Sequence, residues 1–159
     1  DGTNIDLILE SDMNSGTSYT VTVNNIPDIF GNVLSGAQAS FTYYFVEIAE
    51  RGDVVISEFM YNEPDGYSEY IELYNSSNKV FDLRGWQQAN DTGSRNVISD
   101  ESRFFTPGSY IVILRNLNIL NFFSDISYVN AGSNLSALKN GGDEIVITNE
   151  NNVTLDSKH

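Results

Sequence analysis

The chain has 159 residues, of which 40% are hydrophobic and 12% aromatic, enough to bury the core of one ordinary domain or two small ones. Its 22 acidic and 8 basic residues give a formal net charge of -14, and the basic residues are scattered singly, so we expect no direct binding to nucleic acid. The lack of cysteine excludes disulfides and thiolate metal sites, and no apolar run is long enough for insertion into a membrane.

The composition changes near residue 50. Residues 1–48 contain no Lys or Arg, whereas all 8 basic residues lie in 49–159. On both sides, β-branched and aromatic residues recur at period two between Gly, Asn, Asp and Pro, a pattern typical of strands and turns. The sequence therefore predicts an all-β protein of two parts joined by a linker at 49–53.

The first part has three expected strands, at 5–9, 19–23 and 41–45. In the second of these, Tyr19, Val21 and Val23 alternate with polar residues and give one apolar face. The motifs SGTSYTVTV, D-x-x-G-N and ASFTYYF resemble the C-terminal half of a bacterial Ig-like domain of the surface-layer type. The resemblance implies a partial Ig-like β-sandwich over 1–48, because a complete one needs about seven strands. We expect self-association through residues 1–48, since too few strands cover the apolar face.

The second part carries enough strands for its own core. The motif YIVIL, at 110–114, is apolar on both faces and predicts a central strand. Turn sequences such as EPDG, TPGS and NGGD separate the expected strands. These strands lie at 54–61, 69–75, 80–87, 110–115, 144–148 and 153–156. Their spacing predicts an antiparallel β-sandwich over 54–159.

A resemblance to a known family rests on the order of five motifs. These are VVISEFMYNEP, SEYIELYNSSNKVFDLRGW, FTPGSYIVI, LKNGGDEIVI and LDS. The chain from 54 to 159 is similar to the lamin-tail domains of bacterial proteins. The resemblance implies an Ig-like β-sandwich with Trp86 in its core, where it has a structural role. It also implies an accessory module of the kind that accompanies hydrolases, nucleases and adhesive arrays.

The stretch from 54 to 77 is rich in carboxylates and nearly matches a calcium-binding EF-hand loop. Gly66 and Glu72 take the sixth and twelfth positions, but Tyr61 stands where the first carboxylate is required, and both flanks are expected strands. The sequence therefore argues against an EF-hand and leaves a weak calcium site as an alternative. Its ligands would be Glu63, Asp65, Glu69 and Glu72, or else the acidic residues of the linker region, Glu47, Glu50 and Asp53.

Glu58 and Glu72 lie on neighbouring expected strands, as the carboxylates of a glycosidase can. Glu72 shares its face with Tyr70 and Tyr74, which indicates a solvated position. Glu58 has the parity of Val54, Ile56 and Met60, and if that face is inward, its carboxylate needs hydrogen-bond partners. We expect a structural role in which Glu58 accepts hydrogen bonds that fix a neighbouring loop.

Catalysis that depends on histidine is disfavoured, because the only histidine is His159 at the end of the sequence. We therefore expect no enzyme and no cofactor, apart from the calcium alternative. The predicted function is a non-catalytic binding or spacer module of a larger secreted or cell-surface bacterial protein, which recognises protein or surface glycan. The alternative is a carbohydrate-binding or calcium-dependent accessory module of an attached hydrolase or nuclease. Exposed Tyr67, Tyr70 and Tyr74 would favour that alternative.

Overall fold

A computed structural model describes residues 6–90, 93–139, 142 and 144–159. The chain divides into two compact units, 1–45 and 46–159, which are described separately. The regular elements are strands and two short 3-10 helices, so the prediction of an all-β protein is confirmed. In the described part of the chain, no helix has the length and hydropathy to span a membrane.

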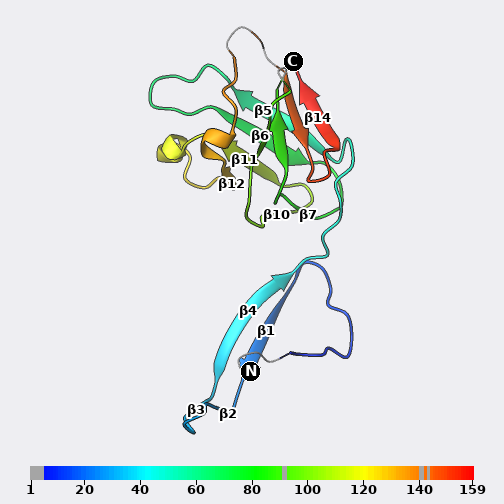
Figure 1. Ribbon diagram of the computed structural model, residues 1–159, viewed down its shortest axis with the longest axis vertical. Coiled ribbons are helices and arrows are strands. Elements are labelled where there is room, and N and C mark those ends of the chain that lie inside the picture. The colour runs from blue at the N-terminus through cyan, green and yellow to red at the C-terminus, as the bar shows by residue number, and fades with distance from the viewer. Residues whose placement is uncertain (1–5, 91–92, 140–141, 143) are drawn as a thin grey trace. The chain divides into compact units, whose positions relative to one another are not determined.

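Unit 1 is built on a long antiparallel hairpin (Figure 1). Strand β1 (Thr17–Val23) pairs with β4 (Ala37–Tyr43), and β2 (Ile26–Pro27) pairs with β3 (Val33–Leu34) near the tip. The Asp28 carboxylate closes the tip by accepting hydrogen bonds from the backbone N–H groups of Phe30 and Asn32, at 2.8 and 2.9 Å. The Asn32 side chain also donates to Asp28, and these bonds lower the pKa of that carboxyl.

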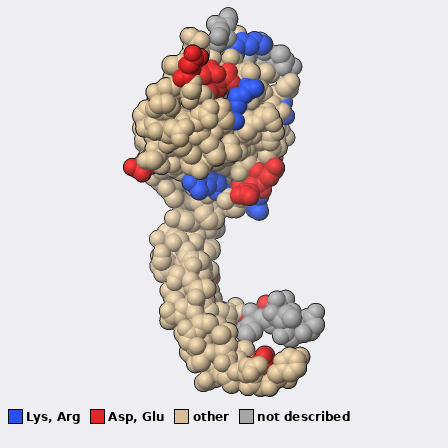
Figure 2. Space-filling view, turned by 90° about the vertical axis from the view of Figure 1, so that its left-hand side faces the viewer, with Lys and Arg blue, Asp and Glu red and all other residues tan. Residues whose placement is uncertain are grey.

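The two faces of the hairpin differ. Cross-strand hydroxyl pairs, such as Thr20 with Ser40 at 2.8 Å, line one face, and the rings of Tyr19 and Phe41 stack on the other. Among the described residues of unit 1, none is buried, and Ile29 is 94% exposed. Uncharged side chains cover most of the face of unit 1 seen in Figure 2.

Two strand predictions in unit 1 were wrong. The strand expected at 41–45 lies further toward the N-terminus and ends at Tyr43. Of the strand expected at 5–9, residue 5 lies outside the described residues and 6–9 form no strand. No neighbouring strand pairs with 6–9, and apolar alternation alone does not make a strand without a partner.

Unit 2 is a β-sandwich of two four-stranded sheets (Figure 1). The first sheet has the order β12-β11-β6-β5, with β5 (Val54–Met60), β6 (Tyr70–Asn75), β11 (Tyr110–Leu114) and β12 (Tyr128–Asn130). Its strands are antiparallel except for the parallel pair β11 and β12. The second sheet has the order β14-β13-β8-β9, with β8 (Gln87–Ala89), β9 (Arg95–Val97), β13 (Ile145–Thr148) and β14 (Thr154–Lys158).

Shorter elements complete unit 2. A small pair joins β7 (Phe81–Asp82) to β10 (Phe104–Phe105). The 3-10 helices are η1 (Leu117–Asn121) and η2 (Gly132–Asn134). The Asn116 side chain caps the first of them by accepting a hydrogen bond from the Asn118 N–H at 2.9 Å. Most of the turn NGGD, at 140–143, lies outside the described residues.

The core fills the space between the sheets and follows the predicted alternation. Ile71 and Leu73 of β6 point inward and are fully buried, whereas Tyr70 and Glu72 are partly exposed. YIVIL forms the central strand β11, as its two apolar faces predicted. The Trp86 side chain is 1% exposed, and its ring lies 5.9 Å from that of Phe81.

A second, smaller apolar cluster covers part of the outer face of the first sheet. Val112 and Leu114 of β11 pack there under Ile119 of η1. Tyr67, Tyr70 and Tyr128 pack against the same cluster. This covering explains why β11 is apolar on both faces although it belongs to a two-layer fold.

Two predictions about unit 2 require correction. The strand expected at 80–87 is interrupted between β7 and β8, because Gly85 adopts a φ of +81° in a turn where Trp86 N–H donates to the Leu83 carbonyl. The linker expected at 49–53 belongs to unit 2. Ala49 is buried, and its carbonyl accepts a 2.8 Å hydrogen bond from the side chain of Asn149.

Candidate functional site

Glu58 is exposed, so the inward position that its parity with Val54, Ile56 and Met60 allowed does not occur. The pairing of β5 with β6 shifts between Ile56 and Glu58, which is the signature of a β-bulge. Ile56 is buried, whereas Ser57 and Glu58 are both exposed, and Phe59 packs against the core. The extra residue therefore reverses the parity on which the sequence argument depended.

The Glu58 carboxylate accepts a short hydrogen bond from the Tyr70 hydroxyl across the two strands. Burial, that hydrogen bond and the charges of Glu58 and Glu72 raise the pKa of Tyr70 to about 12. Beside them, the Ser57 hydroxyl donates to the Glu72 carboxylate at 2.8 Å. Both carboxylates are thus engaged by hydroxyl groups on the outer face of the sheet, rather than facing each other across a cleft.

Glu69 is the buried carboxylate of this stretch. It is 8% exposed, and its two oxygens accept hydrogen bonds from the Arg115 guanidinium at 2.8 Å and from the Leu138 N–H at 3.2 Å. It therefore joins β6, the end of β11 and the 135–139 segment. The sequence analysis listed Glu69 as a possible calcium ligand and did not identify this structural role. The available signal was the apolar alternation that follows Glu69, which predicts a half-buried strand.

The remaining predicted calcium ligands do not converge. Glu63 and Asp65 are exposed in the loop between β5 and β6. Within the described ranges, no group of three acidic or histidine side chains is arranged to hold a metal ion. Of the acidic residues near 50, Glu50 and Asp53 contact the Lys79 ammonium at 3.1 and 2.9 Å.

The aromatic residues that could favour sugar binding are divided between two environments. The rings of Tyr67 and Phe122 stack with their centroids 4.2 Å apart. Tyr70 packs against the small apolar cluster on the outer face of the first sheet. Tyr74 instead lies 4.7 Å from Tyr110, which is 53% exposed. Tyr74 with Tyr110 is thus one partly exposed aromatic pair, and Tyr67 with Phe122, which is also 53% exposed, is another. The sequence analysis identified neither Tyr110 nor Phe122.

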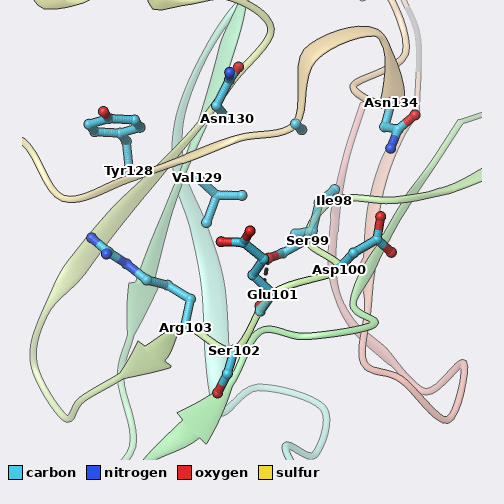
Figure 3. A pocket seen from close by; sticks show the side chains of 11 residues that line it. Ile98, Ser99, Asp100, Glu101, Ser102, Arg103, Tyr128, Val129, Asn130 and Asn134 are labelled. Atoms are coloured by element: carbon cyan, nitrogen blue, oxygen red, sulfur yellow. Dashed lines mark hydrogen bonds between the residues drawn. The ribbon is translucent and has the colours of Figure 1, made fainter.

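A cavity of unit 2 forms a groove between strand β12 and the segment 98–103, called the β12 groove below (Figure 3). Its volume is about 550 Å³, within the usual range of about 300–1,000 Å³ for ligand pockets. Buried Ile98, Val129 and Ala131 contribute apolar surface. The polar lining comes from Ser99, Asp100, Glu101, Ser102, Arg103, Tyr128, Asn130 and Asn134.

The wall at 98–103 is fixed by hydrogen bonds to its neighbours. The Arg103 guanidinium reaches the Ser127 hydroxyl at 3.1 Å, beside the start of β12. The Asp82 carboxylate accepts from the Ser102 hydroxyl at 2.8 Å and from the Arg103 N–H at 2.9 Å. Burial alone would raise the pKa of Asp82, but these bonds and those from Arg84 outweigh it and lower the pKa.

This arrangement predicts a pH dependence for Asp82→Asn. A carboxyl whose pKa is lowered on folding stabilises the fold above its unfolded pKa of about 3.9, and this contribution disappears as the pH falls through the lower folded pKa. The melting temperature of the variant should therefore lie below that of the unmodified chain at neutral pH and approach it in acid. Thermal unfolding followed by circular dichroism at a series of pH values measures the difference. A difference that stays constant between neutral and acid pH would contradict this role.

The groove holds polar groups without a hydrolytic set. The hydroxyl of Ser99 donates to the Glu101 carbonyl, and that of Ser102 donates to Asp82. His159, the chain's single imidazole, lies near Glu144 at 3.7 Å and does not line this groove. Chemically, the groove offers hydrogen-bonding groups, two carboxylates, one guanidinium and an apolar surface, which suit binding.

Comparison with known proteins agrees with the fold. The sequence model of the Lamin Tail Domain family matches residues 47–158. That range starts just before the segment expected as a linker, 49–53, and covers all strands of both four-stranded sheets of unit 2. A search of curated proteins gives no match. With the Ig-like sandwich of unit 2 and a match over most of its sequence, the chain belongs to the lamin tail domain family, whose members are non-enzymatic Ig-like modules.

Proposed function

We propose that this chain is a non-catalytic interaction module of a larger secreted or cell-surface bacterial protein, and that it binds a partner polypeptide in the β12 groove. The observation that carries the proposal is the groove itself, a mainly polar lining around the buried side chains of Ile98, Val129 and Ala131. Buried apolar area supplies affinity, and a few oriented polar groups supply specificity. Membership of a family of non-enzymatic Ig-like modules supports the non-catalytic part of the proposal.

Charge argues for a basic partner. The chain carries a formal charge of -14, and Asp100 and Glu101 are exposed on the groove wall. The Arg103 guanidinium is already hydrogen-bonded to Ser127. An acidic surface accelerates association with basic segments and disfavours acidic ones.

Selection from a display library of random peptides tests this proposal. Peptides enriched on the full chain should be basic, and they should bind more weakly to the double variant Asp100→Arg with Glu101→Arg. The matched control, Glu63→Arg with Asp65→Arg, makes the same change in net charge in the exposed loop and should leave binding nearly unchanged. No enrichment, or equal losses in both variants, would overturn the proposal.

The non-catalytic part has its own test. The full chain should not turn over chromogenic glycosides, esters, phosphodiesters or plasmid DNA. Glu58 and Glu72 are the carboxylates to examine, because they lie opposite each other on β5 and β6. Turnover that is lost in Glu58→Gln or Glu72→Gln would identify an enzyme.

Self-association through unit 1 is a second part of the proposal. The hairpin leaves apolar side chains such as Ile29 and Phe30 exposed, and the sequence from 1 to 48 resembles part of an Ig-like domain. We expect the full chain to be dimeric or larger and a chain shortened to 46–159 to be monomeric, because exposed apolar faces recruit partners. Light scattering measures both masses. Two monomers would contradict this part.

The carbohydrate alternative depends on the pair Tyr74 and Tyr110, since a sugar ring stacks on an exposed aromatic face. It predicts saturable binding of the full chain to an immobilised glycan array and loss of that binding in Tyr110→Ala. Phe123→Ala, another exposed aromatic substitution, is the matched control. Our account predicts no glycan binding that depends on Tyr110.

Calcium provides another expected result. The Arg115 guanidinium and the Leu138 N–H already engage Glu69, and Ser57 engages Glu72, so binding at the predicted set would require these contacts to break. We therefore expect millimolar Ca²⁺ to leave the melting temperature unchanged. Calorimetric titration is the direct measurement. Saturable heat that is lost in Glu63→Gln with Asp65→Gln would favour the calcium-dependent alternative.

A further inference from the structure

The outer edge of β12 is an unpaired sheet edge that faces the β12 groove. In the parallel ladder, Val112 N–H donates to the Ser127 carbonyl at 2.9 Å and Ala131 N–H donates to the Leu114 carbonyl at 3.0 Å. Alternate residues of a strand bond to the same neighbour, so the N–H and C=O groups of Tyr128 and Asn130 point away from β11. No hydrogen bond of these backbone groups is found within the part of the chain that the structure describes.

The opposite edge of the same sheet is covered. Ile56 N–H of β5 donates to the Asp156 carboxylate at 2.8 Å, and Gly52 N–H donates to the Leu155 carbonyl at 3.1 Å. Strand β14 therefore lies along β5 and occupies that edge. Proteins usually cover or interrupt sheet edges, because an open edge is a template for another strand. The contrast makes the β12 edge the available position for strand addition in this sheet.

We infer that an extended basic segment of a partner protein adds to the first sheet as a strand beside β12. This inference rests on the proposed function and names its binding mode. Backbone groups of the added strand pair with those of Tyr128 and Asn130, which gives affinity that is independent of side chains. Side chains of a strand alternate between faces, so every second one lies on the side of the groove where the buried Ile98 and Val129 form part of the lining.

The partner's intervening residues carry positive charge. Asp100 and Glu101 are exposed on the facing wall, and Glu101 lies near the middle of the labelled residues in Figure 3. Because these carboxylates line the groove, we expect Lys or Arg side chains of the added strand to pair with them. Alternation of basic and β-branched residues therefore fits both the charges and the apolar surface.

A capped peptide of alternating lysine and valine tests the inference on the full chain. Calorimetry should show saturable binding, which weakens with Glu101→Lys. Two further peptides carry N-methyl groups, one on every valine amide and the other on every lysine amide. In an added strand, the amides of one set face β12 and those of the other set face away, so one methylated peptide should bind like the parent and the other should fail.

Hydrogen exchange supplies an independent readout. The parent peptide should slow exchange of the Tyr128 and Asn130 amides by about tenfold or more, since they become paired. The Val129 amide, which the ladder directs toward β11, should change much less.

The outcomes separate this inference from the proposed function. If both methylated peptides bind as the parent does, the groove holds a basic peptide without strand addition, so the inference is wrong and the proposed function stands. The inference is also wrong if the parent peptide does not bind at millimolar concentration. In that case the proposed function is tested separately by the peptide-library selection described above. If the full chain is a dimer that Glu101→Lys dissociates, a second copy occupies the edge and the inference is wrong.

Discussion

Replacing Trp86 with alanine should cost about 3 to 5 kcal/mol of the free energy of unfolding, the usual range for a large buried aromatic residue. The side chain is 1% exposed, packs against Phe81 and belongs to the core between the two sheets. The turn that precedes it leaves little room for adjustment, because a Cβ at Gly85 would lie 3.3 Å from that of Glu150. Unit 2 should therefore lose about 10 °C or more in melting temperature.

Chemical denaturation of the full chain measures this loss. The backbone signal in circular dichroism follows the unfolding, because it does not require the tryptophan that the variant lacks. Trp86→Phe should cost less, because it leaves a smaller cavity. Phe123→Ala is the control for loss of an exposed aromatic residue and should change stability little. An unchanged midpoint in Trp86→Ala would contradict the position of this side chain in the core.

Replacing Asn75 with alanine should cost about 3 kcal/mol, because it leaves several buried backbone groups without a partner. Asn75 is fully buried at the end of β6. Its amide donates to the carbonyls of Lys79 and Phe105 at 2.9 and 3.0 Å, and its oxygen accepts from the N–H and hydroxyl of Ser77. The side chain thereby joins the turn after β6 to strand β10.

The conservative variant Asn75→Asp separates the two halves of this network. It keeps the acceptor oxygen for Ser77 and loses the donor to Lys79 and Phe105, so it should also be strongly destabilised at neutral pH. Asn118→Ala removes an exposed amide and should have little effect. Denaturant unfolding compares the three variants. Equal stabilities of Asn75→Ala and Asn118→Ala would show that the buried network is unimportant.

Sequence patterns predicted the strands that are long enough to show a regular alternation of apolar and polar residues. The alternation of β6 and the two apolar faces of YIVIL were sufficient to place β6 in a half-buried position and β11 in the centre of its sheet. Both strands are long enough for their periodicity to be recognised. The short strands β9, β10 and β12 have two or three residues each, and periodicity carries no information over such lengths.

The candidate site was harder to predict, because tertiary structure determines it. One extra residue in β5 reverses the direction of Glu58, and no local pattern reveals a bulge. Glu69 looks like a surface acid until Arg115, far along the chain, is brought next to it. The β12 groove combines the segments 98–103 and 128–134, which are separated in the sequence by β10, β11 and η1, so no single sequence motif identifies it.

The most direct test of the central claim uses a photoreactive amino acid in place of Asn134 in the full-length protein, within the cells that produce it. Asn134 lines the β12 groove and leaves the groove carboxylates intact, and Asn118, another exposed asparagine, is the matched control position. Our account predicts that illumination yields a discrete adduct with another polypeptide from position 134, and much less of it from position 118. Equal adducts from both positions, or no polypeptide adduct from position 134, would contradict it.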